Sequence, residues 1–293
     1  MSALVVNVLG TGLWADGLGT WDEACARWRV DASDGGGATA PTGKPQTSLL
    51  PPAERRRAPA TVALALAVAE QACRQAGFEP QNLRSVFSSA HGDLEITDYL
   101  CSTLAESPEH LSPTKFHHSV HNAASGYWTI GVGNMQASTA ISAGRHSFAQ
   151  GLLEAAAQAV CEQAPVLLVA YDMPAPAPLM AITGSMSLVG LALVLAPPAL
   201  APASEDAAST LMTLHLQSMA MPEVINGSEG GSFQGHPVTA ALMGRSPMAV
   251  GLPLFEALAA MDCQSPGIAD CCFWLSSAQA LAVSLSRKSA GAR

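Results

Sequence analysis

One segment of the chain, residues 136–144, restricts the fold more than any other because it joins a strand directly to a long helix. Its sequence is Gln-Ala-Ser-Thr-Ala-Ile-Ser-Ala-Gly, and a helical apolar pattern follows. We therefore predict a strand at residues 136–140, a turn of small residues, and a helix at residues 145–163. A side chain on such a turn lies at a helix N-terminus, where free N–H groups and the helix dipole favour negative charge. This position would lower the pKa of a thiol and activate it, but it holds Ile141, which has no nucleophilic atom.

Strand-like and helix-like patterns alternate over most of the chain. Strands are predicted at residues 4–9, 83–89, 136–140, 166–171 and 188–195, and helices at residues 20–28, 59–77, 95–105, 112–132 and 145–163. A glycine-rich turn is expected after the first strand, and a mobile loop at residues 31–52. Such alternation is typical of an α/β fold, so we predict buried parallel strands covered by helices in a layered sandwich.

The rest of the chain gives weaker signals. Residues 197–207 have the composition of a linker, and residues 223–237 that of an exposed loop. A strand is predicted at residues 211–219, a helix at 254–261, and a closing strand pair at 271–275 and 280–286. We expect residues 1–200 to form the main unit and residues 201–293 to form a short C-terminal extension packed on the same domain.

The composition favours a chain with a protein partner. Hydrophobic residues make up 49% of the sequence and charged residues only 13%. So low a charged fraction indicates that a partner subunit covers part of the surface, although an alanine-rich globular protein would have the same composition. The net charge is −9, and the basic residues are scattered apart from Arg55, Arg56 and Arg57. Nucleic-acid binding is therefore not expected.

Cysteine usage and hydropathy indicate a soluble cytoplasmic protein. The seven cysteines form no Cys-x-x-Cys pair, which favours free thiols in a reducing compartment. The first residues lack the basic and apolar regions of an export signal. The longest apolar run, residues 188–196, is far shorter than the roughly 20 residues that span a bilayer, so no membrane binding is expected.

Two motifs resemble those of the β-ketoacyl synthases. The stretch that begins at Ser112 and ends at Gly133 is similar to the helix that precedes the nucleophile strand in that family. Residues 139–144 resemble the nucleophile turn, which is typically Thr-Ala-Cys-Ser-Ser-Gly. The match covers about residues 85–196 and is most similar to the chain length factors of aryl polyene pigment clusters. It implies a thiolase-like layered sandwich, truncated relative to a full ketosynthase, with residues 1–200 as the N-terminal half.

The chain departs from the family pattern at the positions that a ketosynthase needs for catalysis. A working ketosynthase needs a nucleophilic cysteine and two histidines, which stabilise an oxyanion during decarboxylation. The cysteine position holds Ile141, which also differs from the glutamine of the family's decarboxylating relatives. After this turn the chain has only His146, His215 and His236, none of them in a family motif. The resemblance therefore implies a catalytically inactive homologue that needs no cofactor.

By resemblance, the chain is a non-catalytic chain length factor of polyene or type II polyketide biosynthesis. It would pair with an active ketosynthase as a heterodimer, close that partner's acyl tunnel, and meet the acyl carrier protein through the complex. The resemblance places Lys115 and Phe116 at the tunnel and pairs the 136–140 strands of the two subunits. The tunnel and interface candidates are Lys115, Phe116, His117, His118, His121, Gln136, Ala137, Ser138, Thr139 and Ala140.

Other polar clusters resemble metal, catalytic-base or phosphate-binding sites, but another role is simpler or a required residue is missing. His117 and His121 are four residues apart and could both face a metal, but no carboxylate stands at a useful spacing, so we predict hydrogen bonding at an interface or in a cavity. His91 could pair with Asp93 as a base, although the simpler expectation is that Asp93 or Thr97 caps the following helix. Residues 227–231 are glycine-rich, but the Lys-Ser/Thr of a phosphate loop does not follow. No metal site is therefore predicted.

Two rival hypotheses stay open. The chain could be an unconventional acyltransferase or hydrolase that uses a serine or cysteine nucleophile, although Ser142 and Ser147 lack a Gly-x-Ser-x-Gly elbow. It could also be a free-standing acyl-binding protein. An isolated chain that aggregates and is rescued by a co-expressed ketosynthase would favour the partner hypothesis.

Overall fold

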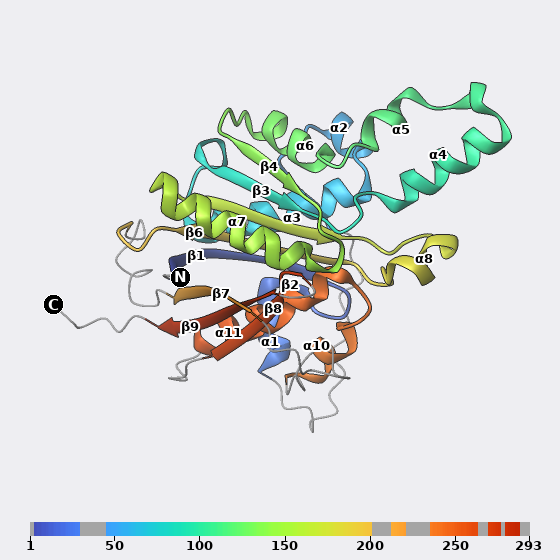
Figure 1. Cartoon of the computed structure of the whole chain (residues 1–293). Helices are drawn as coiled ribbons and strands as arrows, with labels where there is room; N and C mark the ends of the chain where they lie inside the picture. The colour runs from blue at the N-terminus through green and yellow to red at the C-terminus, as the bar shows by residue number, and fades with distance from the viewer. Residues whose placement is uncertain are drawn as a thin grey trace.

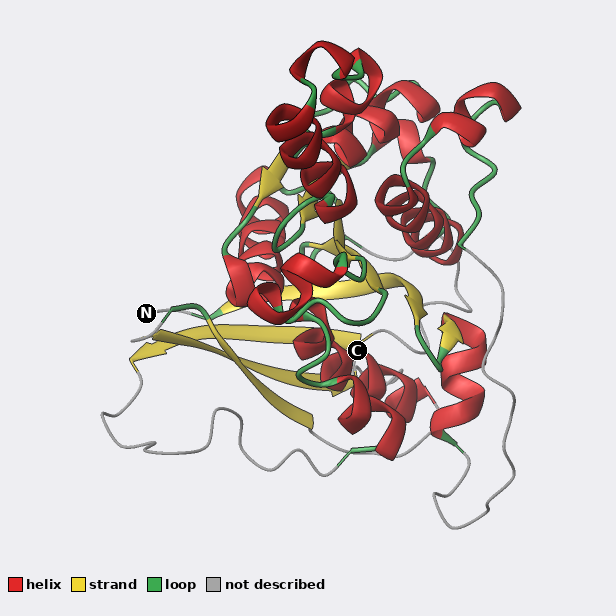
Figure 2. Ribbon diagram, turned by 90° about the vertical axis from the view of Figure 1, so that its right-hand side faces the viewer, coloured by secondary structure: helices red, strands yellow, loops and turns green. Residues whose placement is uncertain are grey.

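The predicted layered α/β architecture is confirmed. A computed structural model describes residues 3–29, 45–200, 212–220, 235–262, 269–276 and 279–287. Its strands form one nine-stranded sheet in the order β4-β3-β5-β6-β1-β7-β9-β8, with β2 paired to β1. Helices cover both faces (Figures 1 and 2). The strands are β1 (Leu4–Ala15), β2 (Gly19–Thr20), β3 (Arg84–Ser88), β4 (Ser138–Ile141), β5 (Val166–Asp172), β6 (Val189–Ala196), β7 (Met212–Ala220), β8 (Ala269–Trp274) and β9 (Gln279–Arg287).

The prediction of a parallel sheet is right for only part of it. Among the described strands, parallel pairing joins β3 to β4 and β5, whereas β1 runs antiparallel to β6 and β7, and β5 antiparallel to β6. The cause is the connection from β5 to β6. Residues 173–188 hold only a short helix, and they return the chain without the long face-covering crossover that a parallel pair needs.

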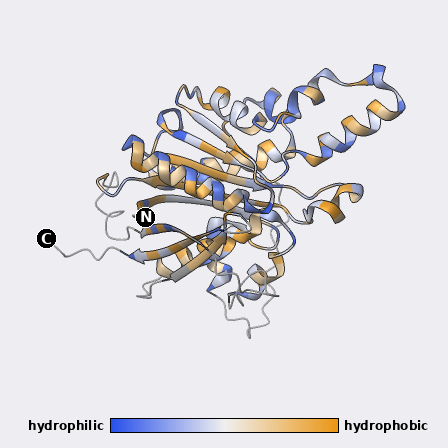
Figure 3. Ribbon diagram, viewed as in Figure 1, coloured by the Kyte–Doolittle hydropathy of each residue, from blue (hydrophilic) through white to orange (hydrophobic). Residues whose placement is uncertain are grey.

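Two helical layers bury the sheet. On one face α3 packs against β1, β5 and β6, and on the other α7 packs against β1, β3 and β5. Hydrophobic residues are concentrated in the central strands (Figure 3). The α-helices are α1 (Trp21–Trp28), α2 (Pro52–Arg57), α3 (Ala60–Ala76), α4 (Leu94–Glu106), α5 (Pro113–His118), α6 (Ala123–Val132), α7 (Ser147–Glu162), α8 (Ala177–Thr183), α10 (Pro237–Leu242) and α11 (Leu252–Asp262). The 3₁₀ turns are η1 (Pro80–Asn82), η2 (Pro108–His110), η3 (Gly144–His146) and η4 (Pro247–Gly251).

The first strand is longer than predicted, and its glycines explain the difference. We expected a turn after residue 9, but β1 continues to Ala15. A Cβ atom on Gly10 would lie 2.2 Å from the Ala72 carbonyl oxygen, and one on Gly12 would lie 2.0 Å from that of Val68. These glycines therefore allow α3 to pack directly on the strand, and they form no turn.

The helix predicted at residues 112–132 is two helices. Ser112 caps the first as expected, but α5 ends at His118 and α6 begins only at Ala123. The Ser119 hydroxyl donates to the Phe116 carbonyl at 2.7 Å. Polar side chains that take up backbone hydrogen-bonding groups in this way compete with the helix and end it.

The C-terminal segment extends the same sheet. β7 pairs with β1, β9 with β7, and β8 with β9, so the predicted strand pair is confirmed. The helix predicted at residues 254–261 lies within α11. Most of the three predicted loop or linker segments, at residues 31–44, 201–207 and 223–234, lies outside the described residues. No helix in the described part of the chain is long and apolar enough to cross a membrane.

Candidate functional site

A turn joins β4 to α7, as predicted, but β4 covers residues 138–141 and not 136–140, so the nucleophile position ends the strand and does not lie in the turn. Ile141 is the last residue of β4, and its partly buried side chain packs against the core. The hydroxyl of Ser142 donates to the Ala90 carbonyl at 2.9 Å. The α-helix begins at Ser147, later than the expected residue 145, because the 3₁₀ turn η3 precedes it and the Ser147 hydroxyl accepts the Ala143 N–H at 2.9 Å.

The two candidate serines and one buried thiol are not prepared for nucleophilic attack. Ser142 and Ser147 both donate to backbone carbonyls, those of Ala90 and Gly144. Burial raises the pKa of the Cys73 thiol to about 12, so this thiol stays neutral near pH 7. These contacts do not favour the hydrolase or acyltransferase hypothesis.

The histidines available as oxyanion donors lie in separate elements and have structural partners. Nδ1 of His146 is 3.0 Å from a carbonyl oxygen of β8. His215 lies on β7, where its Nε2 is 3.4 Å from a hydroxyl of β9. His236 caps α10 by accepting a backbone N–H at 3.2 Å. None of these contacts involves Ile141.

We expect the chain alone to acquire no acyl group at residue 141, and Ile141→Cys to leave condensation at background. The substitution supplies a thiol but not the imidazole donors, and loss of one oxyanion donor already costs about 10²–10³-fold in rate. Incubation with acyl carrier protein thioesters, followed by mass spectrometry of protein and products, checks both expectations. A stoichiometric adduct on any serine or cysteine of the native chain would contradict them, as would condensation by the variant.

Among the described strands, β4 lies at the end of the sheet and pairs only with β3, so its other edge is free in this part of the chain. The carbonyls of Ala137 and Ile141 accept backbone N–H groups along and just beyond β3, at 3.1 and 3.2 Å. Because successive residues of a strand alternate in direction, the N–H and C=O groups of Ser138 and Ala140 point away from β3. These groups are available to a strand of another chain.

Apolar side chains are exposed beside this edge. Met135, which precedes β4, is 93% exposed, and Ile130 on α6 is 84% exposed. Gln136 and Ala137 are also exposed, whereas Thr139 is half-buried. Exposed apolar side chains next to an unpaired strand are typical of an interaction surface.

The helices α4 and α5 form an arm that projects away from the sheet (Figure 1). They pack on each other, and Ile96 is the buried residue of α4. Tyr99 joins the two helices, because its hydroxyl accepts the Ser112 N–H at 3.3 Å and the Lys115 ammonium lies 3.8 Å from its ring centroid. The side chain of Phe116 is 60% exposed. Lys115 and Phe116 are both exposed, but the ammonium of Lys115 is held against the Tyr99 ring within the arm.

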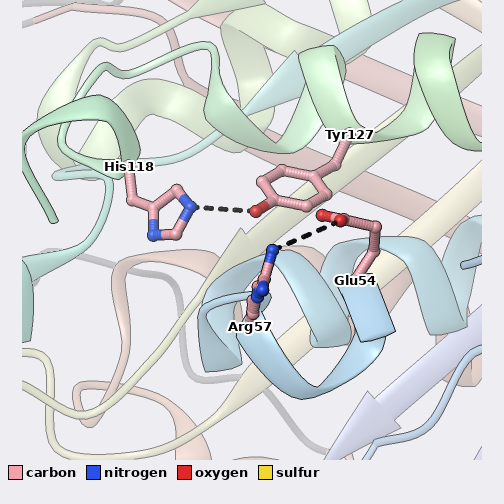
Figure 4. A network of polar contacts seen from close by, with 4 residues as sticks. All are labelled: Glu54, Arg57, His118 and Tyr127. Carbon is pink, nitrogen blue, oxygen red and sulfur yellow. Dashed lines mark hydrogen bonds and ion pairs between the residues drawn. The ribbon is translucent and has the colours of Figure 1, made fainter. Parts of the chain in front are cut away.

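His118, the last residue of α5, attaches the arm to the rest of the fold. This ring is buried, and its Nε2 lies 2.9 Å from the Tyr127 hydroxyl of α6. The Glu54–Arg57 ion pair of α2 lies next to them (Figure 4). Burial lowers the pKa of His118, and the neighbouring His117 lowers it further. The neutral imidazole is therefore favoured in this contact.

The other candidate histidines do not converge with it. His117 is exposed, and Nε2 of His121 lies 3.1 Å from the Ser89 carbonyl oxygen. Within the described ranges, no group of three or more His, Cys, Asp or Glu side chains is arranged to hold a metal ion. Asp93 accepts the Ile96 N–H at 2.9 Å, so its predicted role as a helix cap is confirmed.

Asp172 is the residue of this region that the sequence patterns did not single out. It ends β5, is 2% exposed, and accepts the Ser89 hydroxyl at 2.7 Å and the Ala90 N–H at 3.1 Å. Burial raises its pKa to about 7, although these hydrogen bonds lower it. The signal that could have revealed it is a carboxylate that closes an otherwise apolar strand, because such groups are buried only with partners.

Comparison with known proteins identifies the family. Residues 27–245 match the family described as the N-terminal domain of the β-ketoacyl synthases. The chain belongs to this family. This match confirms the predicted resemblance to the β-ketoacyl synthases. No curated protein matches the sequence of the chain.

Solved structures of ketosynthases have the same fold. A ketosynthase in complex with its chain length factor from Xenorhabdus doucetiae is similar with a TM-score of 0.65 and 20% identity, over 97% of this chain and 100% of that chain. The ishigamide ketosynthase/chain length factor gives 0.64 and 15%, over 97% and 99%. A type II polyketide acyl-carrier protein in complex with its ketosynthase gives 0.70 and 13%, over 98% and 100%. This chain therefore has the thiolase-like fold of the ketosynthases.

Proposed function

We propose that this chain is a non-catalytic chain length factor that pairs with an active β-ketoacyl-[acyl carrier protein] synthase in polyene or type II polyketide biosynthesis. The observation that carries the proposal is Ile141 at the nucleophile position of a ketosynthase fold. Isoleucine forms no thioester, so the chain would contribute to elongation through a partner. Two of the similar solved structures pair a ketosynthase with a chain length factor, which supports this role.

The proposed partner would join at the free edge of β4. Its own edge strand would extend the sheet through the outward-facing backbone groups of Ser138 and Ala140. The exposed Met135 and Ile130 would then be covered by the partner. The acyl carrier protein would meet this chain only through the complex.

The proposed control of chain length is steric. Phe116 would form part of the wall that closes the partner's acyl tunnel, because it is exposed on an arm that projects from the body. An acyl chain that meets this ring would have to overpack the tunnel, at a cost of about 1–3 kcal/mol. Elongation would stop at that length.

Phe116→Ala is expected to lengthen the product by at least one two-carbon unit. The ring is exposed in the chain alone, so its removal should change the free energy of unfolding by no more than about 0.5 kcal/mol. Elongation reconstituted with the ketosynthase and acyl carrier protein, with products sized by mass spectrometry, measures the effect. Lys115→Ala tests the neighbouring position in the same assay.

A matched control removes an exposed apolar side chain elsewhere. Met219 on β7 is 43% exposed, and Met219→Ala should leave both product length and complex formation unchanged. If Phe116→Ala and Lys115→Ala leave the products unchanged in an intact complex, chain length is set by the ketosynthase, and the tunnel part of the proposal is wrong.

A further inference from the structure

The arm that carries Phe116 leaves the sheet through one short turn, residues 89–92. This turn follows β3, and α4 begins shortly after it at Leu94. Ser89 and Ala90 are 0% and 4% exposed, so the start of the turn is part of the core. The conformation of this turn therefore influences the direction in which α4 departs.

Three separate elements hold the turn. At the end of β5, Asp172 accepts the Ser89 hydroxyl at 2.7 Å and the Ala90 N–H at 3.1 Å. Between α5 and α6, Nε2 of His121 lies 3.1 Å from the Ser89 carbonyl oxygen. After β4, the Ser142 hydroxyl donates to the Ala90 carbonyl at 2.9 Å. The turn is thus fixed from β5, from the base of the arm, and from the nucleophile position.

Among these contacts, Asp172 fixes both the backbone and a side chain of the turn through a single oxygen, Oδ1. Once the Ser89 hydroxyl donates to Asp172, its oxygen is oriented to accept the Gly92 N–H at 2.9 Å. Gly92 has a φ of 69°, a conformation that glycine adopts without strain. Loss of the carboxylate would leave two buried donors without an acceptor and release the hydroxyl that shapes the turn.

We propose that Asp172 is a positioning residue that fixes the 89–92 turn and thereby sets the direction of the α4–α5 arm and the place of Phe116. The first part concerns this chain alone. The second part, the place of Phe116 against a partner, rests on the proposed function.

Native cysteines provide a direct measurement of the arm. Cys101 on α4 and Cys161 on α7 are both exposed, so spin labels on them report the distance between the arm and the helical layer on the sheet. The distance distribution is measured by double electron–electron resonance on the full chain. The background carries serine at the remaining cysteines of the C-terminal region, Cys263, Cys271 and Cys272.

Asp172→Ala should shift and broaden this distance distribution, because the turn loses its acceptor. Asp172→Asn should retain the native distribution, because the amide oxygen can still accept both hydrogen bonds. If the alanine variant does not fold, Ser89→Ala serves instead, since it removes the hydroxyl contact but leaves the buried Ala90 N–H paired. An unchanged distribution in the folded variants overturns the proposal.

A control carboxylate tests whether the effect is specific. Glu70 on α3 also accepts hydroxyl and backbone N–H groups: the Thr47 hydroxyl at 2.9 Å, the Ser48 N–H at 3.0 Å and the Ser48 hydroxyl. Glu70→Ala should leave the arm distance unchanged. A shift as large as that of Asp172→Ala would indicate general loosening and would also overturn the proposal.

Product lengths separate this inference from the proposed function. In the complex with the ketosynthase, Asp172→Ala should spread the products over more lengths, and Asp172→Asn should keep the native pattern. If the arm moves and the products do not change, the positioning role stands and the tunnel function fails. If the arm does not move, the positioning role fails whatever the products are.

Discussion

A single charge at the free edge of β4 is expected to separate this chain from its ketosynthase. Ala137→Asp places a carboxylate at an exposed position beside the outward-facing backbone of Ser138. An obligate interface of the proposed kind buries more than about 2,000 Å² and is mostly apolar. An unpaired charge buried there costs on the order of 4 kcal/mol, which weakens binding about a thousandfold. Co-purification of the co-expressed pair should therefore be lost.

Two companion variants make this test specific to strand pairing. Ala140→Pro removes an N–H that points away from β3, so it should disrupt pairing between the chains and leave the β3–β4 ladder in place. Ala26→Asp adds the same charge at an exposed position of α1, in another part of the fold, and should leave co-elution unchanged. Unchanged co-elution of both β4 variants would place the interface elsewhere.

Local sequence patterns predicted helices and strands well where the residues that cause an element lie within or next to it. The apolar runs of β5 and β6 gave strands because both are buried throughout, and Ser112 and Asp93 marked helix starts because each caps its own helix. The turn after β1 was wrong because Gly10 is small to accommodate α3, a helix more than fifty residues away in the sequence. A glycine kept for close packing has the same pattern as a glycine kept for a turn.

The residues of the candidate site also differ in whether the sequence alone could predict their role. Ile141 could be identified from sequence, because strand, turn and helix are contiguous there. The partners of His118 and His121 could not be identified, because the break after α5 sends the two rings to Tyr127 and Ser89. The same break lies between His117 and His121, which explains why their four-residue spacing forms no metal site in the described part of the chain.

The free energy of unfolding is expected to fall as the pH rises from about 4 to about 7, with Asp172 as a principal cause. Burial raises the pKa of this carboxyl from 3.8 to about 7. Between these values the folded chain keeps a proton that the unfolded chain has lost, so raising the pH destabilises the fold across this window and has no further effect above it. A shift of this size corresponds to about 4 kcal/mol.

Urea unfolding of the native chain and of Asp172→Asn over this pH range measures the contribution. The amide cannot ionise, so the native chain should lose about 4 kcal/mol more than the variant between the two ends of the range. Subtracting the two curves removes the contribution of the other carboxylates, which both proteins share. Asp22→Asn, at an exposed position in the first turn of α1, controls for the substitution itself. Parallel curves for the native chain and Asp172→Asn would mean that the carboxyl titrates in the fold as it does in the unfolded chain, against the burial argument. A steeper loss of unfolding free energy in the native chain would show that the Asp172 carboxyl, which holds Ser89 and Ala90, prefers to stay protonated.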